Sequence, residues 1–573
     1  MIIREATAEG FLDFRHPIRR IEAWRLKEVL PALRMADEAL ANGSWVAGFI
    51  SYEAAPGLDP AMACHPPVLG LPLVLLGVFQ APTPWHPPSA PPTNPLLRLE
   101  LLPGRSRDAH CRRLDHIRRA IADGETYQVN CTMPMTARTS ADPMDVFETF
   151  CSDTQARYAA YVDCGDTAVV SLSPELFFER RSRDIMTRPM KGTAARGLTT
   201  EDDRAAARRL HRCPKNRAEN VMVADMLRND LGRIAEVGSV QVPALFETER
   251  YPTLWQMTST ITARSTAPLS RVFQALFPCA SVTGAPKVAA MDLIRQVEDG
   301  PRGVYTGSIG FAAPDGRACF SVAIRTAVFQ RKEGELRYDV GSGVVWDSDP
   351  EDEYQECLLK AAALSRARPR FELLETMAWT PKGGWSLLDA HRRRLQDSSE
   401  YHGFKVDWAR VRTALDKAVA NAVHPLRVRL TVDTAGRPNI GTAPLPSAKN
   451  EPIRLDISPL AVDATNPFLY HKTTFRQVYE DARAAAPLGD DTLLCNTRGE
   501  VTETCIANIA ALRHGLLTTP PVSCGLLPGV RRNAMLEAGE LAEGVLTPED
   551  LRRADAVFRL NAVRGLERVV LPG

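Results

Sequence analysis

The stretch "GSGVVWDSDPEDEYQECLLK" (residues 341–360) joins a glycine- and valine-rich segment to a helix-forming one. The glycines predict a turn, in which backbone amides can approach a carboxylate ligand closely. Asp349 is a suitable N-cap and Pro350 suits the first helical position, so we predict a helix that continues to residue 364. Its buried stripe would be Tyr354, Cys357, Leu358, Ala361 and Leu364, and another face would carry Glu353, Glu356 and Lys360. Strand and helix patterns occur in both halves of the chain, which indicates a mixed α/β fold.

A second predicted helix, "KNRAENVMVADMLRND" (215–230), carries Glu219. Taken alone, each of these acidic side chains is what a solvated helix surface also carries. Two carboxylates from separate helices would nevertheless make a reasonable Mg²⁺ site, because that ion prefers hard oxygen ligands and keeps positions for water and an anionic substrate.

The chain has 573 residues, more than one hydrophobic core usually supports, so at least two domains are expected. We place the boundary in "LSRARPR" (364–370), which predicts domains at 1–365 and 371–573 with a linker at 366–370. Both parts mix strand and helix patterns. A proline-dense stretch, residues 81–95, is expected to be a surface excursion.

Composition limits the classes of function. The formal net charge is +1, which gives no electrostatic case for nucleic acid or an anionic membrane as a partner. The first residues lack an apolar signal core, and the 12 cysteines form no CxxC pair, so a reducing, cytoplasmic location without a cysteine metal site is expected.

Two basic residues are candidates for chemistry. "RPMKGTAARG" (188–197) puts Lys191 in a predicted tight turn between Arg188 and Arg196, which would depress its pKa if they lay close. A surface lysine is the alternative. Arg325 lies in "RACFSVAIRTAVFQ" (317–330), a predicted strand, where a guanidinium fork could bind a carboxylate.

Eight motifs in order resemble those of the chorismate-utilising enzymes, the family of anthranilate synthase large subunits and aminodeoxychorismate synthase component I. They are "GETYQVNCT" (124–132), "SLSPELFFER" (171–180), "RPMKGT" (188–193), "KNRAENVMVADMLRNDLGR" (215–233), "CASVTGAPK" (279–287), "GVYTGSIGF" (303–311), "AIRTAV" (323–328) and the opening stretch. The resemblance covers residues 30 to 365. It implies two facing sheets, Mg²⁺ and chorismate as substrate.

The resemblance also implies roles for individual residues. Glu219 and Glu356 would bind the metal ion, and Glu353 would act through water. Substrate contacts would come from Tyr305, Arg325, the amides of Gly341 and Gly343, Thr283, Lys287, Gln256 and Lys360. Many relatives have histidine where this chain has Gln256, which can hydrogen-bond a hydroxyl but cannot donate a proton in acid catalysis.

Lys191 distinguishes the branches of this family. Anthranilate synthases typically carry alanine there, whereas a lysine is taken as the nucleophile that adds to C2 of chorismate while the C4 hydroxyl leaves, with Glu175 as the acid. Ammonia then adds at C4. No run of residues resembles a glutaminase nucleophile, so a separate glutamine amidotransferase or free ammonia is expected. "WVAGFISYEAA" (45–55) resembles a tryptophan-binding region, and a buried strand is the alternative.

Five later motifs resemble the class IV (fold type IV) pyridoxal 5′-phosphate enzymes, over residues 371–573. They are "LLDAHRRRLQDSSEYHGF" (387–404), "LYHKTTFRQVYEDA" (469–482), "NTRGEVTETCIANI" (496–509), "GLLPGVRRNAML" (525–536) and "FRLNAVRGLERV" (558–569). By resemblance, Lys472 would bind the cofactor, Glu503 would pair with its pyridine nitrogen, and Arg394 with the amides of Val530 and Arg531 would hold its phosphate. Ala507 and Ala562 stand where relatives often have hydroxyl side chains. Such relatives usually dimerise, which suggests a homodimer through this domain.

The combination of the two domains predicts the activity. Class IV alone leaves a branched-chain aminotransferase, a D-amino acid aminotransferase and aminodeoxychorismate lyase open, but a para-aminating chorismate enzyme makes the compound that the lyase consumes. We therefore expect a bifunctional enzyme that makes 4-aminobenzoate for folate biosynthesis. The alternatives are an anthranilate- or salicylate-type enzyme fused to an aminotransferase, and a metabolite-binding regulator with inactive sites.

Overall fold

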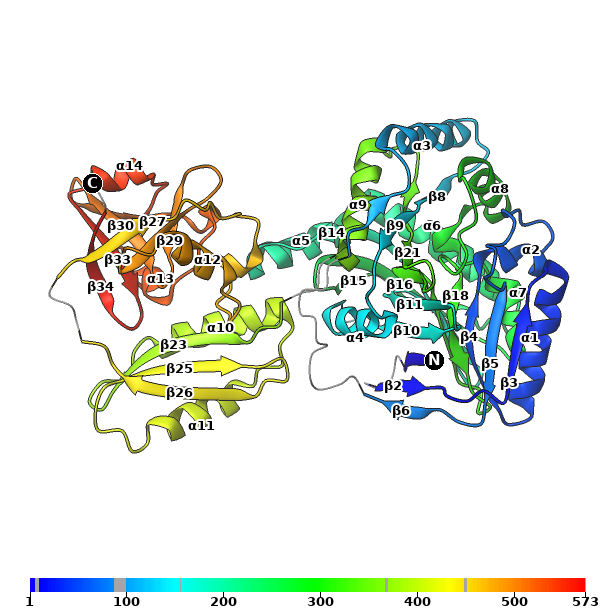
Figure 1. The fold of residues 1–573 in the computed structure, drawn as a ribbon, viewed down its shortest axis with the longest axis horizontal. Coiled ribbons are helices and arrows are strands. Elements are labelled where there is room, and N and C mark those ends of the chain that lie inside the picture. The colour runs from blue at the N-terminus through cyan, green and yellow to red at the C-terminus, as the bar shows by residue number, and fades with distance from the viewer. Residues whose placement is uncertain (6–9, 87–98, 155, 366–368, 448–450, 572–573) are drawn as a thin grey trace. The chain divides into compact units, whose positions relative to one another are not determined.

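A computed structural model describes residues 1–5, 10–86, 99–154, 156–365, 369–447 and 451–571. Contacts divide the chain into two compact units (Figure 1). The N-terminal unit comprises Met1–Ala195 and Ala207–Arg368, and the C-terminal unit comprises Arg196–Ala206 and Pro369–Gly573. The two units are therefore discontinuous in sequence, because residues 196–206 pack with the C-terminal unit. The predicted linker lies largely outside the described residues.

Two large sheets form the N-terminal unit. Among the described residues, one sheet has nine antiparallel strands in the order β6 (Thr83–Trp85), β2 (Gly10–Asp13), β1 (Ile2–Glu5), β10 (Tyr158–Asp163), β11 (Thr167–Ser173), β20 (Thr326–Gln330), β21 (Glu335–Tyr338), β9 (Met135–Arg138) and β7 (Leu102–Pro103). The order of the other is β14 (Met190–Ala195), β16 (Leu254–Arg264), β13 (Asp184–Arg188), β12 (Leu176–Arg181), β19 (Ala318–Val322), β18 (Ser308–Ala312), β4 (Trp45–Ile50), β5 (Val74–Phe79) and β3 (Arg19–Ala23), with β15 (Gln241–Arg250) also paired to β16.

One apolar core joins these two sheets. It contains Ile3, Ala160 and Val169 from the first sheet and Phe49, Leu75 and Phe311 from the second, all buried. Because alternate side chains of each strand point into this layer, the two sheets pack face to face, as the resemblance implied. Part of residues 81–95 lies outside the described residues, and β6 within it is an edge strand, where proline is tolerated.

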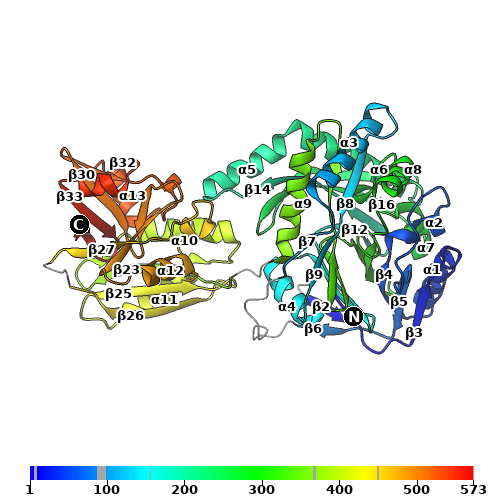
Figure 2. The same cartoon turned by 45° about the horizontal axis from the view of Figure 1, so that its top comes forward.

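A small sheet and the helices complete this unit (Figure 2). The small sheet has the order β17 (Gly284–Ala285), β8 (Gln128–Met133) and β22 (Val340–Val344). The helices are α1 (Leu26–Ala41), α2 (Ala55–Leu58), α3 (Arg107–Ala122), α4 (Pro143–Thr154), α6 (Pro214–Gly232), α7 (Leu269–Leu276), α8 (Lys287–Val297) and α9 (Pro350–Ser365). α5 (Thr200–Arg212) crosses the boundary between the units.

Two of these helices match their predictions. α6 and α9 confirm the helices expected over 215–230 and 349–364, and the Asp349 carboxylate accepts the backbone N–H groups of Glu351 and Asp352 at 2.9 and 3.1 Å. The single strand expected over 317–330 is wrong. It is two strands, β19 and β20, in different sheets, because the chain turns at Arg325, whose φ is 50°.

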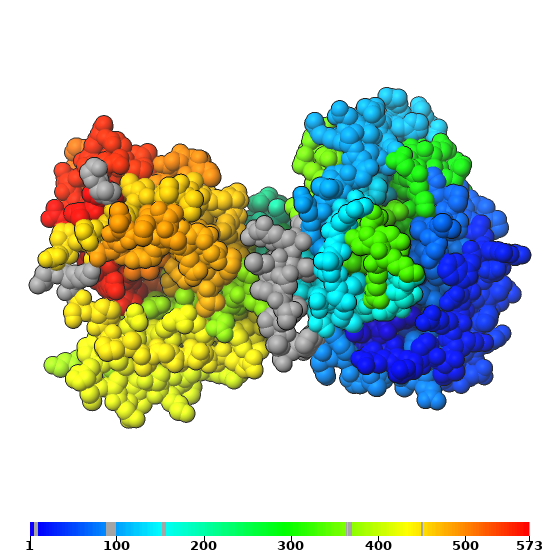
Figure 3. Space-filling view, viewed as in Figure 1, coloured from blue at the N-terminus to red at the C-terminus, as the bar shows by residue number. Residues whose placement is uncertain are grey.

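The C-terminal unit has two parts, which occupy separate halves of this unit in Figure 3 (yellow, and orange to red). The first has the sheet β24 (Gly384–Trp385), β23 (Leu373–Thr380), β25 (Leu426–Val432) and β26 (Pro438–Pro444), with α10 (Leu388–His402) and α11 (Trp408–Val419). The second has the sheet β29 (Val501–Thr504), β28 (Asp491–Cys495), β27 (Ile453–Ile457), β34 (Gly565–Val570), β33 (Ala556–Asn561), β30 (Asn508–Arg513), β31 (Leu516–Thr519) and β32 (Ala542–Glu543), with α12 (Gln477–Ala485), α13 (Val530–Glu537) and α14 (Pro548–Arg552).

Two further observations concern the whole chain. All 12 cysteines are free thiols. Within the described ranges, none of the helices combines the length and the apolar character needed to span a lipid bilayer.

Candidate active sites

A cavity of about 370 Å³ opens in the N-terminal unit where β14, α6, α9 and β22 meet. It is lined by most of the residues that the sequence singled out, although they are up to 185 positions apart between Glu175 and Lys360. The predicted residues in its wall are Glu175, Lys191, Glu219, Gln256, Tyr305, Arg325, Gly341, Gly343, Glu353, Glu356 and Lys360.

Two predicted lining residues are not in this wall. The Thr283 hydroxyl donates to the carbonyls of Cys279 and Ala280 at 3.0 and 3.3 Å, and the residue is fully buried. The Lys287 ammonium pairs with Asp230 at 2.8 Å and donates to the Leu276 carbonyl. Both side chains are therefore engaged within the fold, and neither is among the residues that line the cavity.

Lys191 lies on an irregular strand. The predicted turn is instead β14, whose pairing register with β16 shifts between Met190 and Thr193, and Gly192 there has a φ of 95°. Such a bulge redirects one side chain, and glycine takes this φ without strain. The backbone is fixed on both sides, because the Asn220 amide donates to the Lys191 carbonyl at 3.3 Å and the Gln256 amide donates to the Gly192 carbonyl at 3.0 Å.

The charges around Lys191 differ from those expected. Arg188 pairs with Glu249 at 2.6 Å and Arg196 pairs with Asp203 at 2.6 Å, so neither arginine is the neighbour that the sequence suggested. Burial lowers the pKa of Lys191, and the Lys360 ammonium lowers it further, against the carboxylates of Glu219, Glu175 and Glu356. An amine with a lowered pKa is more readily available as a nucleophile at neutral pH.

Glu175 is buried at the same cavity. Burial raises the pKa of its carboxyl group to about 7, while the hydroxyl of Ser281 and the charge of Lys191 oppose that rise. Its Oε1 also accepts the Met190 backbone N–H at 3.4 Å. A carboxyl group with this pKa is protonated often enough near neutral pH to act as a general acid.

Gly343 leaves room for the Lys191 amine where β22 faces it. A Cβ on Gly343 would lie 2.9 Å from Lys191 Nζ and 2.7 Å from Gln128 Nε2. The amine therefore occupies space that any other residue would fill. We expect Gly343→Ala to displace Lys191 and to lower kcat for chorismate turnover by about tenfold, the cost of a one-ångström misplacement being up to about 10²-fold. Gly300→Ala is the control, since a Cβ there meets no atom within 4 Å. Steady-state rates and melting temperatures of both variants separate the two cases; equal rates would contradict this reading.

The acidic residues fit a magnesium ion in their chemistry. Glu219 on α6 and Glu353 and Glu356 on α9 line the same cavity, and the buried Oε2 of Glu353 has no hydrogen-bond partner among the described residues. Burial raises the pKa values of Glu219 and Glu353, whereas Lys360, 2.6 Å from Glu356, outweighs burial and lowers the pKa of that carboxyl. In the part of the chain that is described, no three carboxylate, histidine or cysteine side chains are clustered closely enough to hold a metal ion, so its ligands are not drawn together in advance.

The cavity wall contains Tyr305 and Arg325 together with polar residues that the sequence analysis did not select. These additional polar residues are Asn130, Thr193, Lys215, Asn216, Ser281 and Asp339. Lys215 lies four positions before Glu219 on α6, a spacing that puts both on one helix face and could have identified it. Nothing in the local sequence signals Asp339, which Arg337 binds at 2.7 Å.

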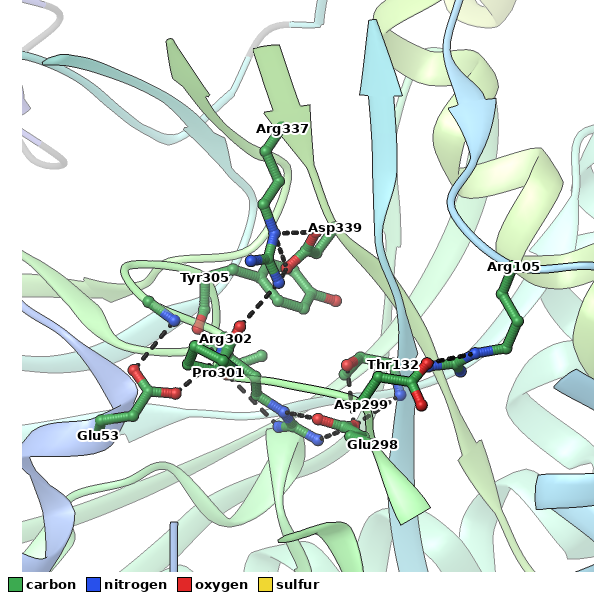
Figure 4. A network of polar contacts seen from close by, with 12 residues as sticks. Glu53, Arg105, Thr132, Glu298, Asp299, Pro301, Arg302, Tyr305, Arg337 and Asp339 are labelled. Atoms are coloured by element: carbon green, nitrogen blue, oxygen red, sulfur yellow. Dashed lines mark hydrogen bonds and ion pairs between the residues drawn. The ribbon is translucent and has the colours of Figure 1, made fainter. Parts of the chain in front are cut away.

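A buried polar network supports Tyr305 (Figure 4). The Arg302 guanidinium binds Glu298 at 2.7 and 2.9 Å and donates to the carbonyls of Val282 and Asn130, both at 2.8 Å. The Glu53 carboxylate accepts the backbone N–H groups of Arg302 and Gly303 at 2.7 and 3.0 Å. The loop that carries Tyr305 is thus held by hydrogen bonds of both its backbone and the Arg302 side chain.

A second cavity, of about 360 Å³, lies within the C-terminal unit. β23, α10 and β25 contribute Leu374, Thr376, Arg394, Arg427 and Arg429, and the second sheet and its connections contribute Lys472, Glu503, Asn508, Gly529 and Val530. Lys472, Glu503, Arg394 and Val530 were all expected in one site, and this cavity contains them. Arg531 follows Val530 in α13.

Burial moves the pKa values of both Lys472 and Glu503 toward neutrality. Burial lowers the pKa of Lys472 to about 8, with help from Arg394 and Arg476. Burial raises the pKa of Glu503 to about 7, and its carboxyl accepts the Tyr479 hydroxyl at 2.8 Å and the Leu527 N–H at 3.2 Å. A lysine with a lowered pKa opposite a buried acid suits a carbonyl cofactor with a ring nitrogen.

The expected phosphate end has a cation and a helix N-terminus. Glu375 holds the Arg394 guanidinium by two bonds of 2.9 and 2.6 Å, and both Glu375 and His391 behind it are buried. A Cβ on Gly529 would lie 1.9 Å from Asn508 Oδ1, so the entry to α13 requires glycine. Ala507 and Ala562 line this cavity, and the Thr504 hydroxyl is bonded to the Ala507 backbone, which leaves a hydroxyl near one of the two positions. The residues present therefore fit the cofactor.

The fold and the two cavities are those of an enzyme built from two different domains. Residues 6–366 match the family model described as chorismate binding enzyme, and residues 372–571 match amino-transferase class IV. The chain therefore belongs to the chorismate binding enzyme family, and it joins such a domain to a class IV aminotransferase domain.

Individual relatives within this family show which of its enzymes the chain is similar to. The chain is 43% identical over 265 residues to an aminodeoxychorismate synthase of Streptomyces griseus, a match covering 45% of this chain and 36% of the relative. It is 40% identical over 253 residues to aminodeoxychorismate synthase component 1 of Klebsiella aerogenes, covering 44% of this chain and 56% of the relative. These matches span about a third to a half of the relatives' length. Anthranilate synthase component I of Streptococcus pneumoniae has the same fold, with a TM-score of 0.54 at 23% identity over 62% of this chain and 92% of its own.

Proposed function

We propose that this chain makes 4-aminobenzoate from chorismate and ammonia in two steps, one in each unit. The observation that carries the proposal is Lys191: an amine of lowered pKa in one cavity with a protonatable Glu175 and four further carboxylates, those of Glu219, Asp339, Glu353 and Glu356. The relatives from Streptomyces griseus and Klebsiella aerogenes are named as aminodeoxychorismate synthases, which supports a para-aminating enzyme.

In the first step Lys191 Nζ would bond to C2 of chorismate. The ring double bonds shift, the C4–O bond breaks, and Glu175 gives its proton to the departing hydroxyl, which leaves as water. Ammonia then bonds to C4, the double bonds shift back, and the C2–N bond to Lys191 breaks. The net change is chorismate and ammonia to 4-amino-4-deoxychorismate and water. Tyr305 and Arg325 would hold a substrate carboxylate throughout.

Magnesium would be held by Glu219 and Glu356, with Glu353 nearby, and would offset the charge of a substrate carboxylate. Lys360, paired with Glu356 and bonded to the Gly341 carbonyl at 2.8 Å, positions both α9 and β22. The Gln256 side chain donates to the Gly192 carbonyl and accepts a hydrogen bond from the Thr193 hydroxyl at 3.2 Å. Its proposed role is therefore to hold β14 in place as well as to contact the substrate.

In the second step the C-terminal unit would release pyruvate. Pyridoxal phosphate, when bound, would supply an electron sink for the substrate's 4-amino group. Lys472 Nζ takes the ring proton at C4, the C3–O bond to the enolpyruvyl group breaks, and the ring becomes aromatic. The enol takes up a proton and leaves as pyruvate. Glu503 holds the proton at the cofactor's ring nitrogen, and Arg394, Val530 and Arg531 hold its phosphate.

Product analysis tests both steps. The protein is incubated with chorismate, Mg²⁺, ammonium and pyridoxal phosphate, and the aromatic product is identified by chromatography. We expect 4-aminobenzoate and one equivalent of pyruvate. Anthranilate as the product would reject the synthase assignment, and 4-amino-4-deoxychorismate without pyruvate would reject the lyase assignment.

The nitrogen source and assembly are part of the proposal. Relatives named "component 1" suggest a separate glutamine amidotransferase subunit, so glutamine alone should not replace ammonium in the purified chain. A homodimer through the C-terminal domain and a cytoplasmic location remain predictions from the sequence.

The pH profile of the first step follows from its two titrating groups. Glu175 must be protonated, so kcat/KM should fall as pH rises through about 7, the pKa to which burial raises its carboxyl. Lys191 must be neutral, so the rate should rise with pH on the acid side. The measurement is the initial rate of chorismate loss at fixed free ammonia concentration. Glu175→Gln should remove the alkaline limb and lower the maximum, and an unchanged profile in that variant would exclude Glu175 as the acid.

A further inference from the structure

Residues 196–206 are contributed to the C-terminal unit from the middle of the chorismate-binding sequence. The chain leaves β14, the strand of Lys191, at Ala195, packs with the C-terminal unit from Arg196 to Ala206, and returns within α5. The family model for the class IV domain begins only at residue 372. These residues therefore belong to the second unit by contact and not by sequence.

Arg196 anchors this segment in the interior of the unit. Its guanidinium forms two bonds to Asp203, of 2.6 and 2.8 Å, and a third of 2.8 Å to the Tyr401 carbonyl. It also lies over the Tyr401 ring at 4.3 Å. The side chains of Arg196 and Asp203 are 7% and 5% exposed, so this paired, bidentate interaction is shielded from water. The Tyr401 hydroxyl in turn donates to the Gly197 carbonyl at 2.8 Å.

The segment contacts the residue that precedes Lys472. The Leu198 carbonyl lies 3.2 Å from His471 Nε2, and Ser398 Oγ lies 3.2 Å from His471 Nδ1. The His471 ring stacks on Tyr401 with centroids 4.1 Å apart. Burial lowers the pKa of His471 to about 4, so the ring is neutral and one tautomer satisfies both bonds, with Nε2 donating to Leu198 and Nδ1 accepting from Ser398.

The segment also reaches the partners of Glu503. The Leu198 side chain packs against the apolar cluster that contains Leu469, Tyr470 and Tyr479. Tyr479 is the residue whose hydroxyl donates to Glu503 at 2.8 Å. One short segment thus contacts His471, the neighbour of Lys472, and packs on the apolar cluster that includes Tyr479, the partner of Glu503.

We propose that residues 196–206 are a positioning element of the C-terminal site, which fixes His471 and Tyr479 and through them orients Lys472 and Glu503. The effect on pyridoxal phosphate rests on the proposed function, but the positioning of residues 469–479 does not. The C-terminal site is then incomplete without a piece of chain that the sequence assigns to the other domain.

The test compares two arginines of the same segment in the full-length chain. Arg196→Gln removes the buried anchor, whereas Arg204→Gln removes an ion pair to Glu400 in which both side chains are about half exposed, 50% and 47%. Exposed pairs contribute little, so Arg204→Gln is the matched control. We expect Arg196→Gln to weaken pyridoxal phosphate binding, measured by absorbance titration, by about tenfold or more, the loss seen when the support of a ligand-binding side chain is removed.

A second readout does not need the cofactor. Amide hydrogen exchange of residues 469–479 in cofactor-free protein should be faster in Arg196→Gln and unchanged in Arg204→Gln, while ammonia-dependent chorismate loss is retained in both. Arg196→Lys, which keeps the charge but not the fork, should recover part of the affinity. If Arg196→Gln does not fold, Leu198→Ala gives the same comparison through its packing.

The outcomes are distinguishable. Equal cofactor affinity and equal exchange in Arg196→Gln and wild type would overturn the proposal, as would equal losses in the Arg204→Gln control. If the wild-type protein binds no pyridoxal phosphate but exchange at 469–479 still rises in Arg196→Gln, the positioning role stands and the proposed lyase function fails.

Discussion

Replacing Lys191 by alanine should abolish amination at C4. The Lys191→Ala variant loses the only group in the first cavity that we propose to bond to the ring, and the rate of 4-amino-4-deoxychorismate formation should fall by about 10²–10⁴-fold, as for other groups that act directly on the reacting atoms. Without the adduct at C2, ammonia can reach that carbon, so the residual product should shift toward the ortho isomer. Chromatography of products formed with ammonium and Mg²⁺ measures both effects.

Lys215→Ala is the matched control for this experiment. Lys215 is a second cation in the wall of the same cavity, on α6, and its loss should weaken substrate binding without changing which carbon is aminated. Amination at C4 by Lys191→Ala at a rate close to wild type would remove the basis of the proposed mechanism.

Replacing Lys472 by alanine should stop the reaction between the two steps. Lys472→Ala loses the amine that binds the cofactor and moves the ring proton, so pyruvate release should fall by about 10²–10⁴-fold. Chorismate should still be consumed at the wild-type rate, and 4-amino-4-deoxychorismate should accumulate. The experiment follows chorismate loss and pyruvate formation in the same sample, and the long-wavelength absorbance of the bound cofactor should disappear in the variant.

Lys417→Ala, on the exposed face of α11, is the control and should match wild type in both assays. If Lys472→Ala still releases pyruvate in step with chorismate loss, the pyruvate arises elsewhere and the lyase assignment to the second cavity is wrong.

Local chemistry in the sequence was a good guide to helices and to charged groups with a partner on the same helix. The N-cap Asp349 predicted the start of α9, and the spacing of Glu353, Glu356 and Lys360 predicted their common face. These features depend on neighbours three or four positions away, which the sequence displays directly.

Features that depend on distant parts of the chain were not predictable. The strand expected through Arg325 is broken because its two halves join different sheets, and the alternation of side chains is the same in either case. The arginines flanking Lys191 are held by Glu249 and Asp203, which are distant from them in sequence or in another part of the fold. The cationic neighbour of Lys191 is Lys360, from a helix 169 positions later. Lys287 is also engaged by a residue distant in sequence, Asp230 on α6, whereas Thr283 bonds locally to the Cys279 and Ala280 carbonyls.

The bonded loop beneath Tyr305 has a consequence for the range of molecules that the first cavity accepts. Since Arg302, Glu298 and Glu53 already satisfy one another and the surrounding backbone, that wall has few alternative arrangements available to it. When a ligand that fits this wall binds, the protein loses little conformational entropy. A bulkier analogue cannot be accommodated, because this wall does not rearrange by induced fit. Near Tyr305 the first cavity should therefore discriminate between ligands by their size, and affinity should fall sharply once a ligand exceeds the available space.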